Sequence, residues 1–229
     1  MPNVINRNTK LLAASLVILL GLAVAMAATI ILTAQNTPPT ETIRVACVGD
    51  SLTQSTYYPS DLQTLLGNNY TVGNFGAGST TVSLGSETPY MNSNAFQDAL
   101  DFQPDIVVIM LGTNDAQPTL HRYNTTFVAD YKALVAAFQA LESKPEIWVV
   151  LPPPIFSNQS GKISPEYFRD TIIPALEQAA NETDLPAINV YSALANYPQY
   201  FPDGVHINSA GAQIIANEVY KAVTKQNTP

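Results

Sequence analysis

Cysteine and histidine are scarce in this chain, which has one cysteine, Cys47, and two histidines among 229 residues. A single cysteine excludes a disulfide within the chain, and inside an apolar run it is typical of a small core residue. Three thiol and imidazole ligands are too few for the usual zinc clusters, and no calcium-loop spacing of carboxylates is present. We therefore expect no metal site.

Basic residues are also few, because 10 lysines and arginines face 18 aspartates and glutamates, for a formal net charge of −8. Arg7 and Lys10 stand near the N-terminus, so eight basic and 18 acidic residues leave the chain beyond them at −10 (8 minus 18). An acidic chain without a basic run is poorly suited to nucleic acid, and we expect no such partner. The 46% of hydrophobic residues and 17 scattered prolines are typical of a globular protein.

Residues 11–32 form a strongly apolar run without a charged residue. As a helix, these 22 residues span about 33 Å, which matches the core of a bilayer. Two basic residues precede the run, so the positive-inside rule predicts a cytoplasmic segment at 1–10, a single-pass membrane anchor at 11–32, a linker at 33–42 and an extracellular domain. Ala25-Met26-Ala27 also fits a signal-peptide cleavage site, and cleavage there would give a secreted domain.

From residue 43 onward, short β-rich apolar runs alternate with segments of helical periodicity. The predicted strands are 43–48, 70–75, 105–111, 146–151 and 187–191. The predicted helices are 60–66, 94–102, 124–141, 165–181 (which Pro174 should kink or split) and 208–225. This alternation favours right-handed βαβ units, so we predict an α/β fold, a three-layer α/β/α sandwich around a five-stranded parallel sheet. In such sheets the site lies beyond the carboxyl ends of the strands.

Two short motifs contain the parts of an activated serine nucleophile. Gly49-Asp50-Ser51-Leu52 directly follows the first predicted strand, which places Ser51 at the carboxyl end of the sheet. A serine hydroxyl needs a base, and Asp203-Gly204-Val205-His206 before the last helix offers a histidine with a carboxylate three residues away. Alone, the first motif also fits a helix cap and the second a surface turn.

Two further motifs follow predicted strands. Gly112-Thr113-Asn114-Asp115 comes after the third strand, and the Asn114 side chain can donate to an oxyanion. The loop 74–81, NFGAGSTT, comes after the second strand, and its small residues let a backbone N–H approach a ligand closely. Each alone fits a turn or a crossover. Together, the four motifs can meet at one edge of one sheet, which favours a common site.

With these motifs, residues 43–225 resemble the SGNH hydrolases, also called GDSL esterases, over nearly the whole predicted domain. Within that family, the segments NFGAGSTT, PDIVVIMLGTND and FPDGVHINSAGA and the run Pro152–Pro154 are most similar to small carbohydrate O-acetylesterases, the acetylxylan and sialate acetylesterase relatives. The resemblance implies a flavodoxin-like sheet and a serine esterase that removes O-acetyl groups from extracellular glycans through an acyl-enzyme. That chemistry implies no metal and no organic cofactor.

The family pattern assigns Ser51 as the nucleophile, His206 as general base and then general acid, and Asp203 as the residue that orients His206. Asp50 and Asp115, which neighbour these motifs, are interpreted as residues that fix loops. The oligomeric state stays open at the level of sequence.

The oxyanion hole implied by the resemblance uses the Ser51 amide, the Asn114 side chain and a backbone amide of the glycine loop. The family usually has a second glycine in that loop at the position that is Ser79 here, and Gly78 comes one residue earlier. The sequence therefore leaves open whether Gly78 or Ser79 supplies the third donor.

Two alternative functions and one candidate binding feature stay open. A lysophospholipase or thioesterase of the same superfamily would use the same chemistry with a longer acyl groove, and a carbohydrate-binding surface protein could keep the scaffold without turnover. An α/β-hydrolase is excluded, because no Gly-x-Ser-x-Gly occurs. Tyr57, Tyr58 and Tyr90 are candidates for an aromatic platform against a sugar.

Overall fold

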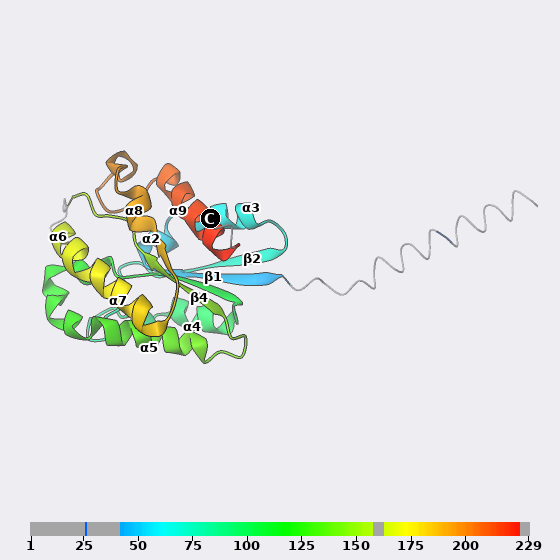
Figure 1. Ribbon diagram of the computed structural model, residues 1–229, viewed down its shortest axis with the longest axis horizontal. Helices are drawn as coiled ribbons and strands as arrows, with labels where there is room; N and C mark the ends of the chain where they lie inside the picture. The colour runs from blue at the N-terminus through cyan, green and yellow to red at the C-terminus, as the bar shows by residue number, and fades with distance from the viewer. Residues whose placement is uncertain (1–25, 27–41, 158–162, 225–229) are drawn as a thin grey trace, which may run out of the picture. The chain divides into compact units, whose positions relative to one another are not determined.

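Five parallel strands form the centre of the computed structural model, which describes residue 26 and residues 42–157 and 163–224 (Figure 1). The strands are β1 (Ile43–Gly49), β2 (Tyr70–Gly76), β3 (Ile106–Met110), β4 (Glu146–Leu151) and β5 (Ala187–Asn189). They lie in the order β2-β1-β3-β4-β5, and each pairing is parallel. The predicted sheet is confirmed. The strand order reverses between β1 and β3, and doubly wound sheets bind their ligands at such a switch point.

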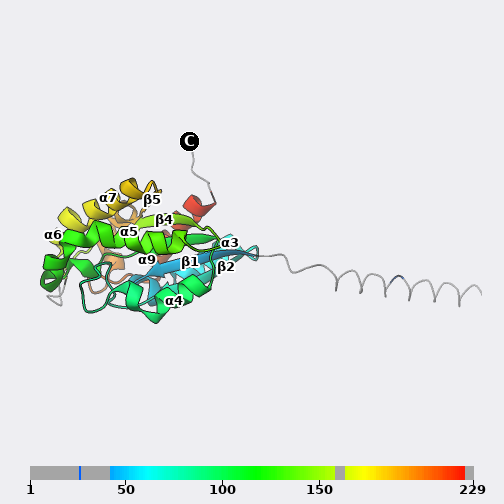
Figure 2. The ribbon, with the colours of Figure 1, turned by 90° about the horizontal axis from the view of Figure 1, so that it is seen from below.

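Helices cover both faces of this sheet (Figures 1 and 2). Successive strand residues point to opposite faces, so Ala46 and Val48 of β1 enter one core while Val45 and Cys47 enter the other. Helices α4 (Asn94–Asp101), α5 (Phe127–Gln139) and α7 (Ile173–Thr183) close the first core, and α3 (Tyr58–Leu66), α8 (Val190–Leu194) and α9 (Ser209–Val223) close the second. Every residue of β3 is buried, which accounts for its uninterrupted apolar sequence. The predicted three-layer α/β/α sandwich is confirmed.

The helical elements begin where the sequence supplies caps. Ser93 Oγ accepts from Phe96 N at the start of α4, and Asn208 Oδ1 accepts from Ala210 N and Gly211 N at the start of α9. The α-helices are α2 (Ser51–Gln54), α3 (Tyr58–Leu66), α4 (Asn94–Asp101), α5 (Phe127–Gln139), α6 (Pro165–Tyr167), α7 (Ile173–Thr183), α8 (Val190–Leu194) and α9 (Ser209–Val223). The 3₁₀ turns are η1 (Tyr90–Asn92), η2 (Asn114–Ala116), η3 (Pro118–Thr126) and η5 (Pro198–Tyr200).

The predicted disturbance at Pro174 is present. A π-helical turn, η4 (Phe168–Ile172), joins α6 to α7 directly before this proline. Proline has no N–H, and its ring clashes with the carbonyl four residues earlier in a regular α-helix. The wider π turn opens the backbone at that point, so the helix continues instead of ending.

Most predicted boundaries shift by one to three residues, and two of these shifts change the type of an element. The fifth strand ends at Asn189, because the Asn189 side chain accepts from Ser192 N and starts α8 there. The helix predicted from 124 to 141 begins at Phe127, and the residues before it form η3.

No helix within 42–157 and 163–224 combines the length and apolarity that crossing a bilayer requires. The predicted cytoplasmic segment 1–10, the anchor 11–32 and the linker 33–42 lie outside the described residues, apart from Met26 and Thr42.

Candidate active site

Ser51 stands at the first position of α2, directly beyond the carboxyl end of β1. Asp50 caps this short helix, because its Oδ1 accepts from Leu52 N at 2.9 Å. The turn requires glycine at position 49, because a Cβ there would collide with the Thr53 side chain and the Met110 carbonyl. The close packing at Gly49 thus lets the chain turn from β1 directly into α2, where Ser51 stands.

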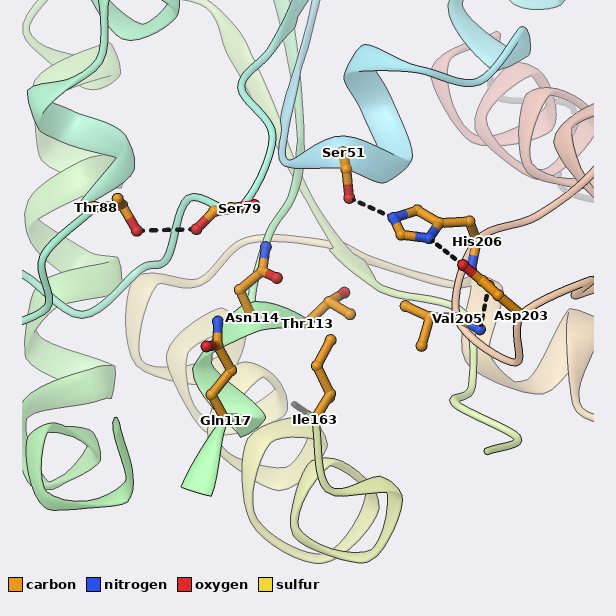
Figure 3. Close-up of a pocket in the computed structure, with 10 residues that line it drawn as sticks. All are labelled: Ser51, Ser79, Thr88, Thr113, Asn114, Gln117, Ile163, Asp203, Val205 and His206. Atoms are coloured by element: carbon orange, nitrogen blue, oxygen red, sulfur yellow. Dashed lines mark hydrogen bonds and ion pairs between the residues drawn. The ribbon is translucent and has the colours of Figure 1, made fainter. Parts of the chain in front are cut away.

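Ser51, His206 and Asp203 form a continuous hydrogen-bonded chain (Figure 3). Ser51 Oγ lies 2.9 Å from His206 Nε2, and His206 Nδ1 lies 2.7 Å from Asp203 Oδ2. The carboxylate holds the ring with its Nδ1 as donor, so Nε2 faces the serine as the acceptor of its proton. The three residues predicted as a triad are thus brought together in the geometry of a nucleophile, a base and an orienting acid.

Asp203 is fixed by backbone as well as by the imidazole. Its Oδ1 accepts from Val205 N at 2.9 Å and from His206 N at 2.7 Å. Burial raises the pKa of the Asp203 carboxyl, but the His206 ring and these two N–H groups outweigh burial and lower the pKa to about 2. Asp203 therefore carries its charge at neutral pH.

The loop that carries the acid and the base is anchored on the segment after β4. Phe156 N donates to Gly204 O at 2.8 Å, and Ser157 Oγ donates to Asp203 O at 3.3 Å. Gly204 has a φ of +82°, and a Cβ there would collide with Ser157. A glycine is thus required between the two functional residues for both conformational and steric reasons.

Asn114 presents its amide to the same space from η2, beyond the end of β3. Its Nδ2 donates to Thr80 O at 3.0 Å, which fixes the orientation of the buried side chain and leaves the second N–H of the group for a ligand. The neighbouring Asp115 accepts from Val82 N and Ser83 N, both at 2.9 Å. The prediction that Asp115 fixes a loop is confirmed, because its carboxylate joins η2 to the loop after β2.

The contacts of the loop after β2 distinguish the amides of Gly78 and Ser79, the two candidates for the third oxyanion donor. Gly78 N donates to Gln54 Oε1 at 2.9 Å, so this amide is already occupied. Ser79 has a left-handed φ of +63°, and it lines the cavity while Gly78 does not. Gln54 was missed at the level of sequence, and a polar residue one turn after the nucleophile was its only signal.

A cavity of about 590 Å³ opens in front of the triad (Figure 3). Eight of its ten lining residues have polar or charged side chains, and Ile163 and Val205 are aliphatic. The lining residues are Ser51, Ser79, Thr88, Thr113, Asn114, Gln117, Ile163, Asp203, Val205 and His206. Thr88, Gln117 and Ile163 lie in loops or irregular turns and had no motif by which they could be found.

The predicted tyrosine platform is wrong for Tyr58 and Tyr90. Both are buried, and the Tyr90 hydroxyl donates to Phe75 O at 2.7 Å inside the fold. Tyr57 is 65% exposed, but it does not line the cavity. Aromatic faces are therefore absent among the described residues that line the cavity.

Two buried carboxyls lie behind the site. Burial raises the pKa of Asp50 to about 7, with the Leu52 N–H opposing the rise and the charge of Asp115 adding to it. Burial likewise raises the pKa of Asp115 to about 6, against the N–H groups of Val82 and Ser83. Asp50 Oδ2 makes no hydrogen bond of normal length within the described part of the chain. No group of three or more potential metal ligands occurs among those residues either.

Comparison with known proteins places the chain in a family. The model of the GDSL-like lipase/acylhydrolase family matches residues 47–214. An acetylxylan esterase of Xylanibacter ruminicola is 33% identical over 212 residues, which cover 81% of this chain and 44% of that protein. The chain thus spans less than half the length of this curated relative.

Solved structures of low sequence identity share the fold. A carbohydrate acetylesterase from Sinorhizobium meliloti superposes with a TM-score of 0.67 at 20% identity, covering 80% of this chain and 99% of that one. The aryl esterase of M. smegmatis superposes with a TM-score of 0.66 at 20% identity, covering 80% and 98%. Because the family model covers most of the chain and the relative exceeds 30% identity, this chain belongs to the GDSL-like lipase/acylhydrolase family of carboxylic ester hydrolases.

Proposed function

We propose that this chain is a serine esterase that removes O-acetyl groups from carbohydrates. The observation that carries the proposal is the hydrogen-bonded chain from Ser51 through His206 to Asp203, which opens into a cavity with further donors. The polar side chains among the lining residues can hydrogen-bond a sugar, and the relatives include proteins named acetylxylan esterase and carbohydrate acetylesterase.

In the first step, His206 Nε2 takes the hydroxyl proton of Ser51 while Oγ attacks the acetyl carbonyl carbon. The charge that develops on the carbonyl oxygen is stabilised by donors aimed at that position. Three such donors are available: Ser51 N, which has no acceptor within its helix, Ser79 N, and Asn114 Nδ2. Asp203 stabilises the imidazolium that forms.

The second step releases the alcohol. His206 gives its proton to the sugar oxygen as the C–O bond breaks, and the acetyl group stays on Ser51. Water then enters, His206 takes one of its protons, and the hydroxide attacks the acetyl-enzyme. Acetate leaves with the proton returned to Ser51, so each group ends where it began and no cofactor is consumed.

The site of action in this proposal is outside the cell. The support is the uncharged run 11–32 with two basic residues before it, which predicts an anchor and an external domain. Protease treatment of intact cells tests it: an external domain is degraded while a cytoplasmic marker survives, and a domain protected until lysis would contradict the proposal.

The activity is tested by following acetate release from 4-nitrophenyl acetate, from acetylated xylo-oligosaccharides and from a long-chain nitrophenyl ester. Ser51→Ala should lower turnover by at least about 10⁴-fold. Ser60→Ala is the matched control, because this exposed α3 serine only donates to Tyr57 O. Turnover of the long-chain ester alone would indicate a lipid-directed enzyme, and binding of acetylated glycan without any turnover would indicate a carbohydrate-binding protein.

A further inference from the structure

Ser79 is held in a conformation that serine rarely adopts. Its φ of +63° is one of four positive values at non-glycine positions in the described part of the chain. The other three lie where helices end: Asp184 is the C-cap of α7, and Gln103 and Lys144 lie in the turns that follow α4 and α5. Left-handed backbone costs a non-glycine residue about 1–2 kcal/mol, and no helix end explains it at Ser79.

The residues around Ser79 impose this backbone, and its own side chain contributes nothing to it. Gly78 N donates to Gln54 Oε1, and Thr88 Oγ1 donates to Ser79 O at 2.9 Å. Thr80 N and Thr80 Oγ1 both donate to Ala77 O, which closes the turn. The Ser79 hydroxyl makes no hydrogen bond to any other described residue. A glycine would therefore keep every contact of this segment without the strain.

The side chain of Ser79 instead belongs to the cavity. Ser79 lies beside Asn114, on the wall that faces Ser51 (Figure 3). His206 approaches Ser51 from the other side, so the leaving alcohol must lie toward His206 and the carbonyl oxygen toward Asn114 and Ser79. Strained residues persist at functional sites where the strain has a use.

We propose that the Ser79 hydroxyl is a fourth donor to the carbonyl oxygen of the substrate, in addition to two backbone amides and the Asn114 side chain. The hydroxyl keeps its proton and makes a hydrogen bond that strengthens as negative charge develops on the oxygen. This assignment makes Ser79 a catalytic residue through its side chain. It rests on the proposed esterase function, because it concerns the same reaction.

The test compares Ser79→Ala and Ser79→Gly with the wild-type full-length chain on 4-nitrophenyl acetate and on acetylated xylo-oligosaccharide. Both variants keep the Ser79 amide. Ser79→Ala removes only the hydroxyl, and Ser79→Gly removes the whole side chain and also relieves the strain. We expect kcat to fall about 10–100-fold on both substrates with KM nearly unchanged. The unfolding midpoint of Ser79→Gly should rise at the same time, and a purely structural residue would not show such opposite changes.

Three outcomes would overturn the assignment. A Ser79→Gly variant as active as the wild type would show that the hydroxyl is not a donor in the reaction. A loss confined to the sugar substrate and expressed in KM would place the hydroxyl on the sugar rather than on the carbonyl oxygen. A wild-type chain that releases no acetate from either substrate would refute the proposed function itself, and the donor with it, whereas the first two outcomes leave that function intact.

Discussion

Replacing Asp50 with asparagine should stabilise this protein. Asp50 is 1% exposed, its Oδ1 caps α2 through Leu52 N, and its Oδ2 lacks a hydrogen bond of normal length. Asparagine keeps the capping oxygen and is an equally good N-cap residue. It removes a buried charge, and its side-chain N–H can donate to Thr113 Oγ1, the buried hydroxyl that interacts with the Asp50 carboxyl.

The magnitude follows from the acid equilibrium of Asp50. Folding raises its pKa from 3.8 to about 7, and each tenfold change in the equilibrium is worth about 1.4 kcal/mol. Above pH 7 the folded state holds the charge, so Asp50→Asn should raise the free energy of unfolding by about 4 kcal/mol. As the pH falls below 7 the folded state binds a proton that the unfolded state does not, so the gain shrinks to roughly 2 kcal/mol at pH 5 and vanishes below pH 3.8.

The assay is urea unfolding at pH 8 and pH 5. The single tryptophan, Trp148, is 8% exposed and reports on unfolding through its fluorescence. Asp50→Ala is the matched variant, because it removes the same charge together with the cap and should be about 1 kcal/mol less stable than Asp50→Asn. A change in the free energy of unfolding that is equal at both pH values would refute the reasoning, because only a titrating charge gives a pH-dependent gain.

Three further predictions concern the loops that carry the site. Gly204→Ala forces a Cβ onto Ser157 at a φ of +82°, so kcat/KM should fall at least about tenfold, and wild-type rates would contradict the role given to this glycine. Asp203→Asn should lower kcat by about 10⁴-fold, and because the Asp203 pKa is about 2, the wild-type rate should show no loss from its protonation in a pH–rate profile above pH 4. Gly112 has a φ of +119°, and a Cβ there would lie 3.2 Å from Ile172 Cγ2. Gly112→Ala should therefore lower the free energy of unfolding by about 1–3 kcal/mol in the same urea assay. An unchanged value would show that the loop accommodates the Cβ without strain.

The sheet could be predicted because its sequence signals are strong and local. A strand covered on both faces must be apolar at every position, and β3 has that pattern without interruption. The disturbance of the helix at Pro174 could also be predicted, because a residue without an N–H disturbs any helix. The start of α8 could not be predicted from the sequence, because Val190 and Tyr191 favour a strand. Only the Asn189 cap starts a helix there.

The candidate site likewise contains residues that could be predicted from the sequence and residues that could not. Ser51, His206 and Asp203 could be placed because each belongs to a motif next to a sheet edge, and parallel strands bring such edges together. The choice between Gly78 and Ser79 depended on Gln54, whose contact joins residues 24 positions apart and has no local signature. The tyrosines misled for a related reason: the sequence shows a hydroxyl on a ring, while the fold decides whether that hydroxyl faces water or a buried carbonyl.

The hydrogen bond between Ser51 and His206 joins residues that are 155 positions apart. Ser51 follows the first strand, and His206 directly precedes the last helix, so the reaction centre closes only after every layer between them has assembled. Closing a loop of that length costs about 4 kcal/mol in chain entropy. During synthesis a nascent chain can therefore hold a complete sheet and still be inert. In a refolding experiment, the return of hydrolysis should lag the burial of Trp148, and ester turnover would time the last event of folding.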